Sequence, residues 1–430
     1  MPDLYKLKVG AGEAPIGYAP EMFPTGGMEN YTGVHDYPYV HAVLIEHEGQ
    51  RYAILCMDLV VIPEAGKIRT FAAAELGVEP ENLILLNPHV LTTPHSILMG
   101  RPGTVFTPEQ YKKQELMDKA NAEAITKAAA DAKATLHPAK FGYKNGYTLF
   151  NVNRVVETAT GWSQGTCDEG DTDHSMPVFR FDDLDGNTIA IFYIVNCAAG
   201  MLEFTKSDDG GRLVSNDIAG ASADFVRKEF PGATVFYLAG ATGDQWQALR
   251  GKFGVVGRGG AYREIDLGDK GWFLMELMGA RLGQQVVRAA DSIELGDVDK
   301  LTLSKTFITV PGRKQARGPA APGTKIEHIR DEDRQVLITV MTLDDVAWIG
   351  TTPEIQTCTV RAIKDASPFG ETAFSGWTGQ GEGSPGTYMV EKELYAHDTY
   401  QANKSCFYPG AAEELRDKVI EIIGDIKAKL

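Results

Sequence analysis

Apolar runs of strand length, each leading to a polar residue, constrain the fold of this chain more than any other feature. They occupy residues 84–86, 191–195, 235–238 and 346–349. Strands that are apolar throughout are buried on both faces, so these runs predict a sheet flanked by helices. The polar residues that follow the four runs are His89, Asn196, Asp244 and Glu354. Ligands bind beyond the carboxyl ends of strands in open α/β sheets, so these residues predict one shared site.

Helix and hairpin signals alternate along the chain. Hairpins are predicted over residues 40–61 and 179–195, and helices over residues 64–76, 108–136, 216–230, 272–290 and 411–429. Further strands are predicted at residues 301–310 and 336–341, with loop-like segments up to Tyr39 and over residues 311–323. The pattern predicts an α/β (mixed α+β) fold with a mixed sheet and flanking helices. We expect a single domain over residues 1–430, with a β-rich part over residues 300–410.

The helix over residues 108–136 has the clearest boundaries. Thr107 can cap it, Pro108 suits its first turn, and Gln110 completes the spacing of a capping box. His137 and Pro138 follow its end.

Charge and cysteine usage exclude several classes of partner. The 42 Lys+Arg and 58 Asp+Glu residues give a formal charge of −16, which repels nucleic acid and anionic membranes. We see no signal peptide, and no apolar run reaches the roughly 20 residues of a membrane span. The five cysteines, at positions 56, 167, 197, 358 and 406, are scattered and odd in number, which favours reduced structural thiols. We therefore expect a cytoplasmic protein with a small-molecule substrate.

Each strand-end residue also has a structural interpretation that the sequence leaves open. His89 follows a proline and can be a satisfied loop residue, and Asn196 can hold loop backbone. Asp244 follows a glycine and can cap the next turn, whereas Glu354 can cap a helix that starts near Ile355.

Short motifs in a fixed order link the chain to a known family. They are GVHDYPYVHA (residues 33–42), PHVLTTP (88–94), Asn153-Arg154, NDIAG (216–220), GATGD (240–244), Thr352-Pro353-Glu354, and a tyrosine block with Tyr388 and Tyr400 twelve residues apart. From about residue 8 to residue 415 this order resembles the neutral/alkaline (non-lysosomal) ceramidase family and its short bacterial relatives. That family has G-x-x-D-x-x-x-x-R-A, T-H-T-H-S-G-P, N-R, D-x-x-G, N-G-x-x-G-D and P-G-E at the corresponding places.

The resemblance implies a ceramidase-like catalytic domain with a metal site. The positions of the family's four zinc ligands are occupied here by His89, Asn196, Glu354 and Tyr388. Arg154 and Tyr400 stand where the family has the two groups that face the reacting carbonyl, and both can donate to an oxyanion. Lipid-active members carry a C-terminal Ig-like domain, whereas this chain ends at Leu430 without one. The resemblance thus implies a substrate other than ceramide.

Departures from the family pattern change the expected chemistry. Leu91 replaces a histidine, and Gln245-Trp246-Gln247 lacks the serine proposed as nucleophile in longer members. Asn196 replaces a histidine ligand and offers an amide oxygen, which suits harder cations better than zinc. His95 or His174 can take over the function of a lost histidine.

Three functions remain open from the sequence. The first is a hydrolase of an amide or similar polarised bond, in which a divalent metal, with zinc as first choice, activates water. Asp244 or a histidine such as His95 would then act as general base. The second is a metal-independent acid/base enzyme that uses Asp244 and Glu354 on a sugar-like substrate. The third is a non-catalytic binding protein on an enzyme fold.

Overall fold

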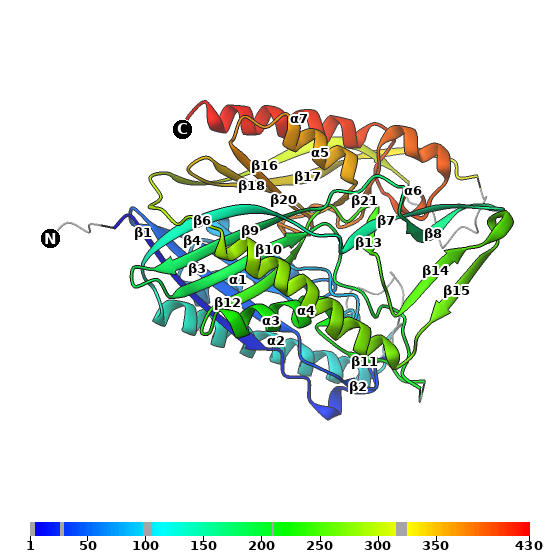
Figure 1. Ribbon diagram of the computed structural model, residues 1–430, viewed down its shortest axis with the longest axis horizontal. Helices are drawn as coiled ribbons and strands as arrows, with labels where there is room; N and C mark the ends of the chain where they lie inside the picture. Colours follow the sequence, from blue (N-terminus) through cyan, green and yellow to red (C-terminus); the bar gives the residue numbers. More distant parts are fainter. Residues whose placement is uncertain (1–4, 26–29, 98–104, 209, 315–324) are drawn as a thin grey trace.

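The computed structural model describes residues 5–25, 30–97, 105–208, 210–314 and 325–430. Within these residues the fold has four layers, because two β-sheets face one another and helices cover the outer side of each (Figure 1). The predicted mixed α/β class with a mixed sheet and flanking helices is confirmed. None of the helices in these ranges is both long and apolar enough to cross a bilayer.

An eight-stranded mixed sheet forms the larger inner layer, in the order β12-β10-β9-β6-β1-β3-β4-β5. β4 pairs with β5 in parallel and β10 with β12, while the other neighbours are antiparallel. Its strands are β1 (Leu7–Pro15), β3 (Tyr39–His47), β4 (Gln50–Met57), β5 (Leu83–Leu86), β6 (His137–Tyr147), β9 (Ser175–Asp183), β10 (Thr188–Val195) and β12 (Thr234–Ala239).

The large sheet folds back on itself at a narrow junction. Two residue pairs join β1 to β6, namely Lys8 with Pro138 and Val9 with His137. The ring of His41 on β3 consequently stacks on Phe236 of β12, with 5.2 Å between ring centroids. The two strands are far apart in sheet order but close in space. The chain segments that leave β5, β10 and β12 can therefore meet at one end of the fold.

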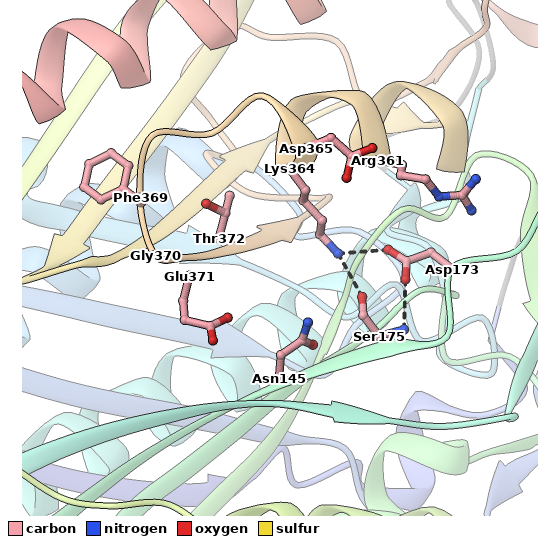
Figure 2. A pocket seen from close by; sticks show the side chains of 10 residues that line it. All are labelled: Asn145, Asp173, Ser175, Arg361, Lys364, Asp365, Phe369, Gly370, Glu371 and Thr372. Atoms are coloured by element: carbon pink, nitrogen blue, oxygen red, sulfur yellow. Dashed lines mark hydrogen bonds and ion pairs between the residues drawn. The ribbon is translucent and has the colours of Figure 1, made fainter.

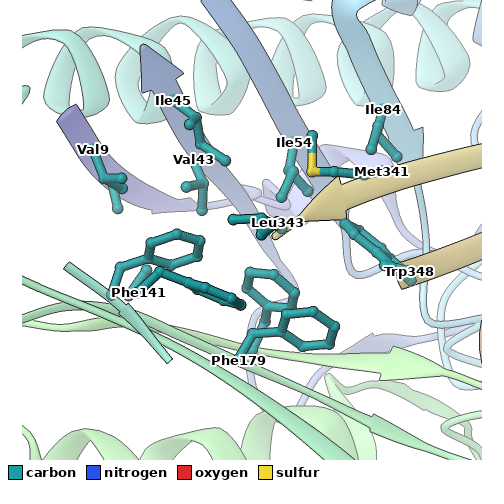
Figure 3. Close-up of a cluster of buried hydrophobic side chains, with 14 of the residues drawn as sticks. Val9, Val43, Ile45, Ile54, Ile84, Phe141, Phe179, Met341, Leu343 and Trp348 are labelled. Carbon is teal, nitrogen blue, oxygen red and sulfur yellow. The ribbon is translucent and has the colours of Figure 1, made fainter. Parts of the chain in front are cut away.

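A four-stranded sheet in the order β16-β17-β18-β20 forms the second inner layer. Its strands are β16 (Leu301–Arg313), β17 (Arg330–Leu343), β18 (Val346–Thr351) and β20 (Glu371–Ser375). The main hydrophobic core lies between the two sheets, where Met341, Leu343 and Trp348 face Val43, Ile54 and their neighbours (Figure 3). The β-rich part expected after residue 300 corresponds to this sheet, although α-helices also belong to the same stretch.

Seven α-helices lie within the described residues, and most cover the outer faces of the sheets. α2 packs on β1 and β3, α3 on β12, α4 on β6 and β9, and α7 on β16. The helices are α1 (Ala65–Leu76), α2 (Pro108–Ala134), α3 (Asp217–Glu229), α4 (Lys270–Asp291), α5 (Thr357–Asp365), α6 (Tyr400–Lys404) and α7 (Ala411–Lys427). The predicted capping box of α2 is confirmed, because Thr107 accepts from Gln110 N and Gln110 accepts from Thr107 N.

The remaining elements are short strands and 3-10 turns, and β7, β19 and β21 among them carry residues of the site described below. The strands are β2 (Gly33–Val34), β7 (Asn151–Thr158), β8 (Gly161–Cys167), β11 (Leu213–Val214), β13 (Gln245–Gln247), β14 (Lys252–Val256), β15 (Tyr262–Asp266), β19 (Glu354–Ile355) and β21 (Tyr388–Met389). The 3-10 turns are η1 (Pro20–Met22), η2 (Pro80–Asn82), η4 (Arg258–Gly260) and η5 (Lys392–His397). β13, β7 and β8 form a three-stranded sheet, and β19 pairs with β21.

Two expectations about loops are wrong. The glycine-rich start contains β1, a nine-residue strand in the middle of the large sheet. A Cβ at Gly10 would lie 2.1 Å from Ala132 O, and one at Gly12 would lie 2.5 Å from Ala128 O. These glycines therefore let α2 approach the strand closely. The loop expected over residues 311–323 begins later, because β16 continues to Arg313 through a bulge after Val310. Residues 315–324 lie outside the described residues.

Candidate active site

The loops after β5 and β10 are joined by backbone hydrogen bonds, which brings two of the predicted strand ends together. Ala199 N donates to Pro88 O at 3.2 Å, and Leu91 N donates to Ala199 O at 2.8 Å. On the opposite wall, Glu354 of β19 pairs in register with Tyr388 of β21.

Arg154 of β7 lies at the centre of the candidate site. Its side chain is 7% exposed, and Nη2 donates to Gly243 O at 3.1 Å. Its guanidinium lies 5.1 Å from the ring centroid of Tyr388 and 5.7 Å from that of Trp246. Burial by itself would lower the pKa of Arg154, but the adjacent Tyr388 and Glu354 raise it above its ordinary value. Arg154 is therefore a buried permanent cation with acidic and aromatic neighbours.

Glu354 contributes the acidic group beside this cation. It is 4% exposed, and its burial raises its pKa to about 7, against the opposing charge of Arg154. Desolvation disfavours the carboxylate, and the guanidinium restores part of its stability. Near neutral pH this carboxyl group can therefore exist with or without its proton.

His89 follows β5 in a left-handed conformation, with φ of 54°. Its Nδ1 donates to Val60 O at 2.5 Å, and its ring stacks on Trp377 with 4.0 Å between centroids. Its burial, followed by the charges of His95 and Arg154, lowers its pKa to about 3. The neutral ring then keeps a lone pair on Nε2, which is the form that binds metals. A left-handed histidine is uncommon, and such backbone conformations concentrate at functional sites.

Tyr388 and Tyr400 form the aromatic side of the site. Their ring centroids lie 5.8 Å apart in an edge-to-face arrangement. Tyr400 is the first residue of α6 and is 39% exposed, whereas Tyr388 is more buried. Burial raises the pKa of both phenols, while the charge of Arg154 opposes it. Both hydroxyl groups therefore stay protonated at neutral pH and can donate hydrogen bonds.

Asn196 and Asp244 are engaged in local structure. Asn196 Nδ2 donates to Asp173 O at 3.1 Å and Ser175 O at 3.2 Å, and its Oδ1 accepts from Ala241 N at 3.0 Å. Asp244 Oδ1 accepts from Thr357 N and Thr357 Oγ1 at 3.0 and 2.9 Å, which fixes the start of α5. A metal at Asn196 would have to share an oxygen that already accepts a hydrogen bond.

A polar cavity of about 310 Å³ is connected to Asn196 through Asp173 and Ser175 (Figure 2). Lys364 Nζ donates to Asp173 Oδ2 at 2.9 Å and to Ser175 Oγ at 2.8 Å. These contacts pair the ammonium with its neighbours and brace the backbone that Asn196 binds.

The structure thus places His89, Glu354, Tyr388 and Tyr400 around the guanidinium of Arg154. Its charge opposes the rise in the pKa of Glu354 and of both tyrosines, and adds to the fall in the pKa of His89. His95 lies near this group, because its charge also lowers the pKa of His89. His89 Nε2 and the Glu354 carboxylate are of the ligand types that suit zinc, and the Tyr388 hydroxyl would have to supply a third ligand. Across the described ranges, no three His, Cys, Asp or Glu side chains form a metal-binding group. The fit of a metal therefore depends on the tyrosine.

Two further charged residues at this end of the fold carry no signal in the sequence. Glu203 lies in a turn between β10 and β11, and its carboxylate forms an ion pair with Arg250 Nη2 at 2.7 Å. The guanidinium of Arg250 lies 3.9 Å from the centroid of the Trp246 ring, which also contacts Arg154. Trp246 is on β13, which pairs with β7 next to Arg154.

The arrangement of the two sheets and their helices is a neutral ceramidase-like fold. No protein-family model matches the sequence, and no curated protein matches it. The crystal structure of neutral ceramidase from Pseudomonas aeruginosa shares the fold with a TM-score of 0.73 and 17% identity, covering 100% of this chain and 75% of that chain. A ceramidase complexed with C2 gives a TM-score of 0.72 and 16% identity, covering 99% of this chain and 76% of that chain. The likeness establishes the fold, and the activity is a separate proposal.

Proposed function

We propose that the protein is a hydrolase that cleaves an amide or similar polarised bond of a small polar substrate other than ceramide, with water as the nucleophile. The observation that carries the proposal is the position of Arg154, a buried cation beside Glu354 and two protonated tyrosines. Permanent donors in a site of low dielectric stabilise the charge that develops on a carbonyl oxygen. The ceramidase-like fold supports the same class of reaction.

Arg154 and Tyr400 are the proposed donors to the oxyanion. The guanidinium is held by Gly243 O and the Tyr388 ring, so it is positioned before substrate binds. Tyr400 is partly exposed on the open side of the site and can reach a bound carbonyl. Water attacks the carbonyl carbon, and His95 takes its proton and returns it to the leaving amine. The carbon–nitrogen bond breaks and the carboxylic acid and the amine are released.

A divalent metal, with zinc as first choice, is the proposed cofactor. His89, Glu354 and Tyr388 would hold it, and Asn196 would contribute only by sharing its Oδ1. When bound, zinc polarises a carbonyl and activates water. The neutral ring of His89, with Nδ1 committed to Val60 O, supports this assignment.

The charged lining supports a polar substrate. Arg154, Arg250, Glu203 and Glu354 place four charged groups at this end of the fold, which suit a polar substrate. All five cysteines lack a disulfide, which supports a reducing compartment, and we retain a cytoplasmic location as part of the proposal.

The acid/base alternative has less support. Asp244 is buried and accepts from both Thr357 N and Thr357 Oγ1 at its Oδ1, so the carboxylate serves as a cap for α5. Because Asp244 is committed to α5 in this way, no contact in the described residues supports its use with Glu354 as an acid/base pair on a sugar-like substrate.

Turnover of a panel of small N-acyl amines and N-acyl amino acids, with a short-chain ceramide alongside, tests the reaction. Arg154→Met should reduce kcat/KM by roughly 10²–10³-fold and Tyr400→Phe by a smaller factor, because each loses one oxyanion donor. Arg263→Met, at an exposed arginine of β15, is the matched control and should leave kcat/KM unchanged. Turnover that survives Arg154→Met at the wild-type rate would contradict the proposal, as would ceramide being the preferred substrate.

Metal analysis of the purified protein tests the cofactor independently of turnover. We expect about one zinc per chain, lost in His89→Ala and retained in Asn196→Ala. A metal content that is unaffected by His89→Ala, with both variants folded by circular dichroism, would refute the assigned ligands.

A further inference from the structure

A second cavity, of about 790 Å³, lies among β7, β8, the start of α5, η5 and the start of α7. Its volume falls in the range of sites for small organic molecules. Asn153 and Val155 line it, whereas Arg154 between them lies over Tyr388 instead. The cavity therefore lies on the other face of β7 from the Arg154 side chain, with Asp244 at the border between the two. The inference below does not depend on the proposed function.

Carboxylates dominate the lining of this cavity. Its acidic residues are Glu169, Asp171, Asp244, Glu391, Glu393 and Glu413, and Arg416 is the one arginine or lysine among the lining residues. Asp171 is balanced by Arg361 from outside the lining, with 2.7 Å between the charged atoms. Arg416 forms an ion pair with Asp417, outside the lining, at 2.9 Å, and its charge also acts on Glu391 and Glu413, so one guanidinium is shared among several carboxylates. The remaining negative charge favours a cationic ligand.

Glu391 and Glu413 are the most crowded of these carboxylates. Burial, and then Glu413, raises the pKa of Glu391. Glu413 Oε1 accepts from Lys392 N at 2.8 Å, while its Oε2 is buried without a partner among the described residues. A cation placed between the two carboxylates would relieve their repulsion and satisfy this oxygen.

Gln356 contributes an amide group to the lining. This residue is 3% exposed in all and lines the cavity. Its Oε1 accepts from Glu391 N at 2.8 Å, which fixes the orientation of the amide. The Nε2 of the same amide is a hydrogen-bond donor, so a ligand with a hydroxyl or carbonyl oxygen would complement it.

An aromatic wall completes the cavity. The rings of Trp162 and His397 stack with centroids 4.3 Å apart and planes 11° apart, and both residues line the cavity. A flat aromatic face next to carboxylates binds ammonium groups and the apolar face of a sugar ring.

We propose that this cavity binds an organic ammonium compound that also carries hydrogen-bond acceptors, as amino sugars do. Carboxylates spread around the cavity provide places for one or more amines, Gln356 donates to an oxygen, and Trp162 covers the ring. A single metal ion would occupy a small part of the volume and would not use the aromatic wall.

Calorimetry at about pH 6.5 tests the proposal with glucosamine and kanamycin as amine probes and glucose as the neutral comparator. We expect at least one amine to bind, and glucose to bind at least tenfold more weakly than glucosamine. Absence of binding by both amines would overturn the proposal, as would equal affinity for glucose and glucosamine. Calcium chloride serves as a further probe, and saturable calcium binding that blocks the amines would assign the cavity to a metal ion instead.

Variants locate the binding. Glu391→Gln should weaken the amine at least tenfold, and Glu393→Gln, at an exposed lining residue, should weaken it several-fold. Glu414→Gln removes the same charge from an exposed position of α7 outside the lining and should have no effect. Unchanged affinity in both Glu391→Gln and Glu393→Gln would place the amine elsewhere on this acidic protein and overturn the assignment.

Discussion

A buried histidine on β3 should make the stability of this fold depend on pH. His41 is 1% exposed, and both ring nitrogens bind carboxylates, Nδ1 donating to Glu13 at 3.0 Å and Nε2 to Asp58 at 2.9 Å. Burial would lower its pKa, but Asp58 and Glu13 outweigh this and raise the pKa from 6.5 to about 9. Each pKa unit corresponds to about 1.4 kcal/mol, so the charged ring stabilises the folded state by about 3 kcal/mol.

The raised pKa fixes the sign of the effect. Below pH 6.5 both the folded and unfolded states carry the proton, and the full contribution is present. Between pH 6.5 and about 9 the unfolded state has lost its proton while the folded state keeps it, so the contribution declines. Above about pH 9 it is gone. Stability from His41 is therefore lost as the pH rises.

Urea unfolding of the wild type and His41→Gln, followed by tryptophan fluorescence, measures this contribution. The difference in unfolding free energy between the two proteins should shrink by about 3 kcal/mol from pH 6 to pH 9.5. His47→Gln is the matched control, because His47 is also buried on β3 but donates from Nε2 to Val298 O. A difference that stays constant with pH, or that grows towards pH 9.5, would refute the reasoning.

Three further substitutions test other parts of the structure. Gly12→Ala places a Cβ 2.5 Å from Ala128 O, so it should lower the unfolding free energy by about 1–3 kcal/mol; an unchanged urea midpoint would contradict the close packing of β1 and α2. Thr107→Ala removes the cap of α2 and should cost about 1 kcal/mol in the same assay, whereas Thr107→Ser should not. Arg313→Met removes a buried guanidinium that donates to carbonyls of α6, the helix that begins with Tyr400. If Arg313 positions this helix, the substitution should reduce kcat more than Tyr400→Phe does, whereas a kcat equal to that of the wild type would exclude this role.

Local sequence signals identified most of the helices and several strands. The capping box at Thr107, the apolar periodicity of α4 and the continuous apolar runs of β10 and β12 are properties of neighbouring residues, and the structure agrees with them. β1 was missed because glycine and proline suppress strand propensity. Its glycines are needed for contact with α2, which lies more than 100 residues further along the chain.

The sequence determined by itself the α/β class, the main elements and the residues that the family resemblance marks. Only the tertiary structure decided which of them meet, because a strand end gives the position of a side chain but not its neighbours. The tertiary fold places His89 close enough to Arg154 of β7 for the arginine's charge to act on the histidine, and the pairing of β19 with β21 sets Glu354 beside Tyr388. The same packing commits Asn196 and Asp244 to backbone groups. Such long-range contacts depend on burial and on hydrogen bonds between distant segments, which no local pattern encodes.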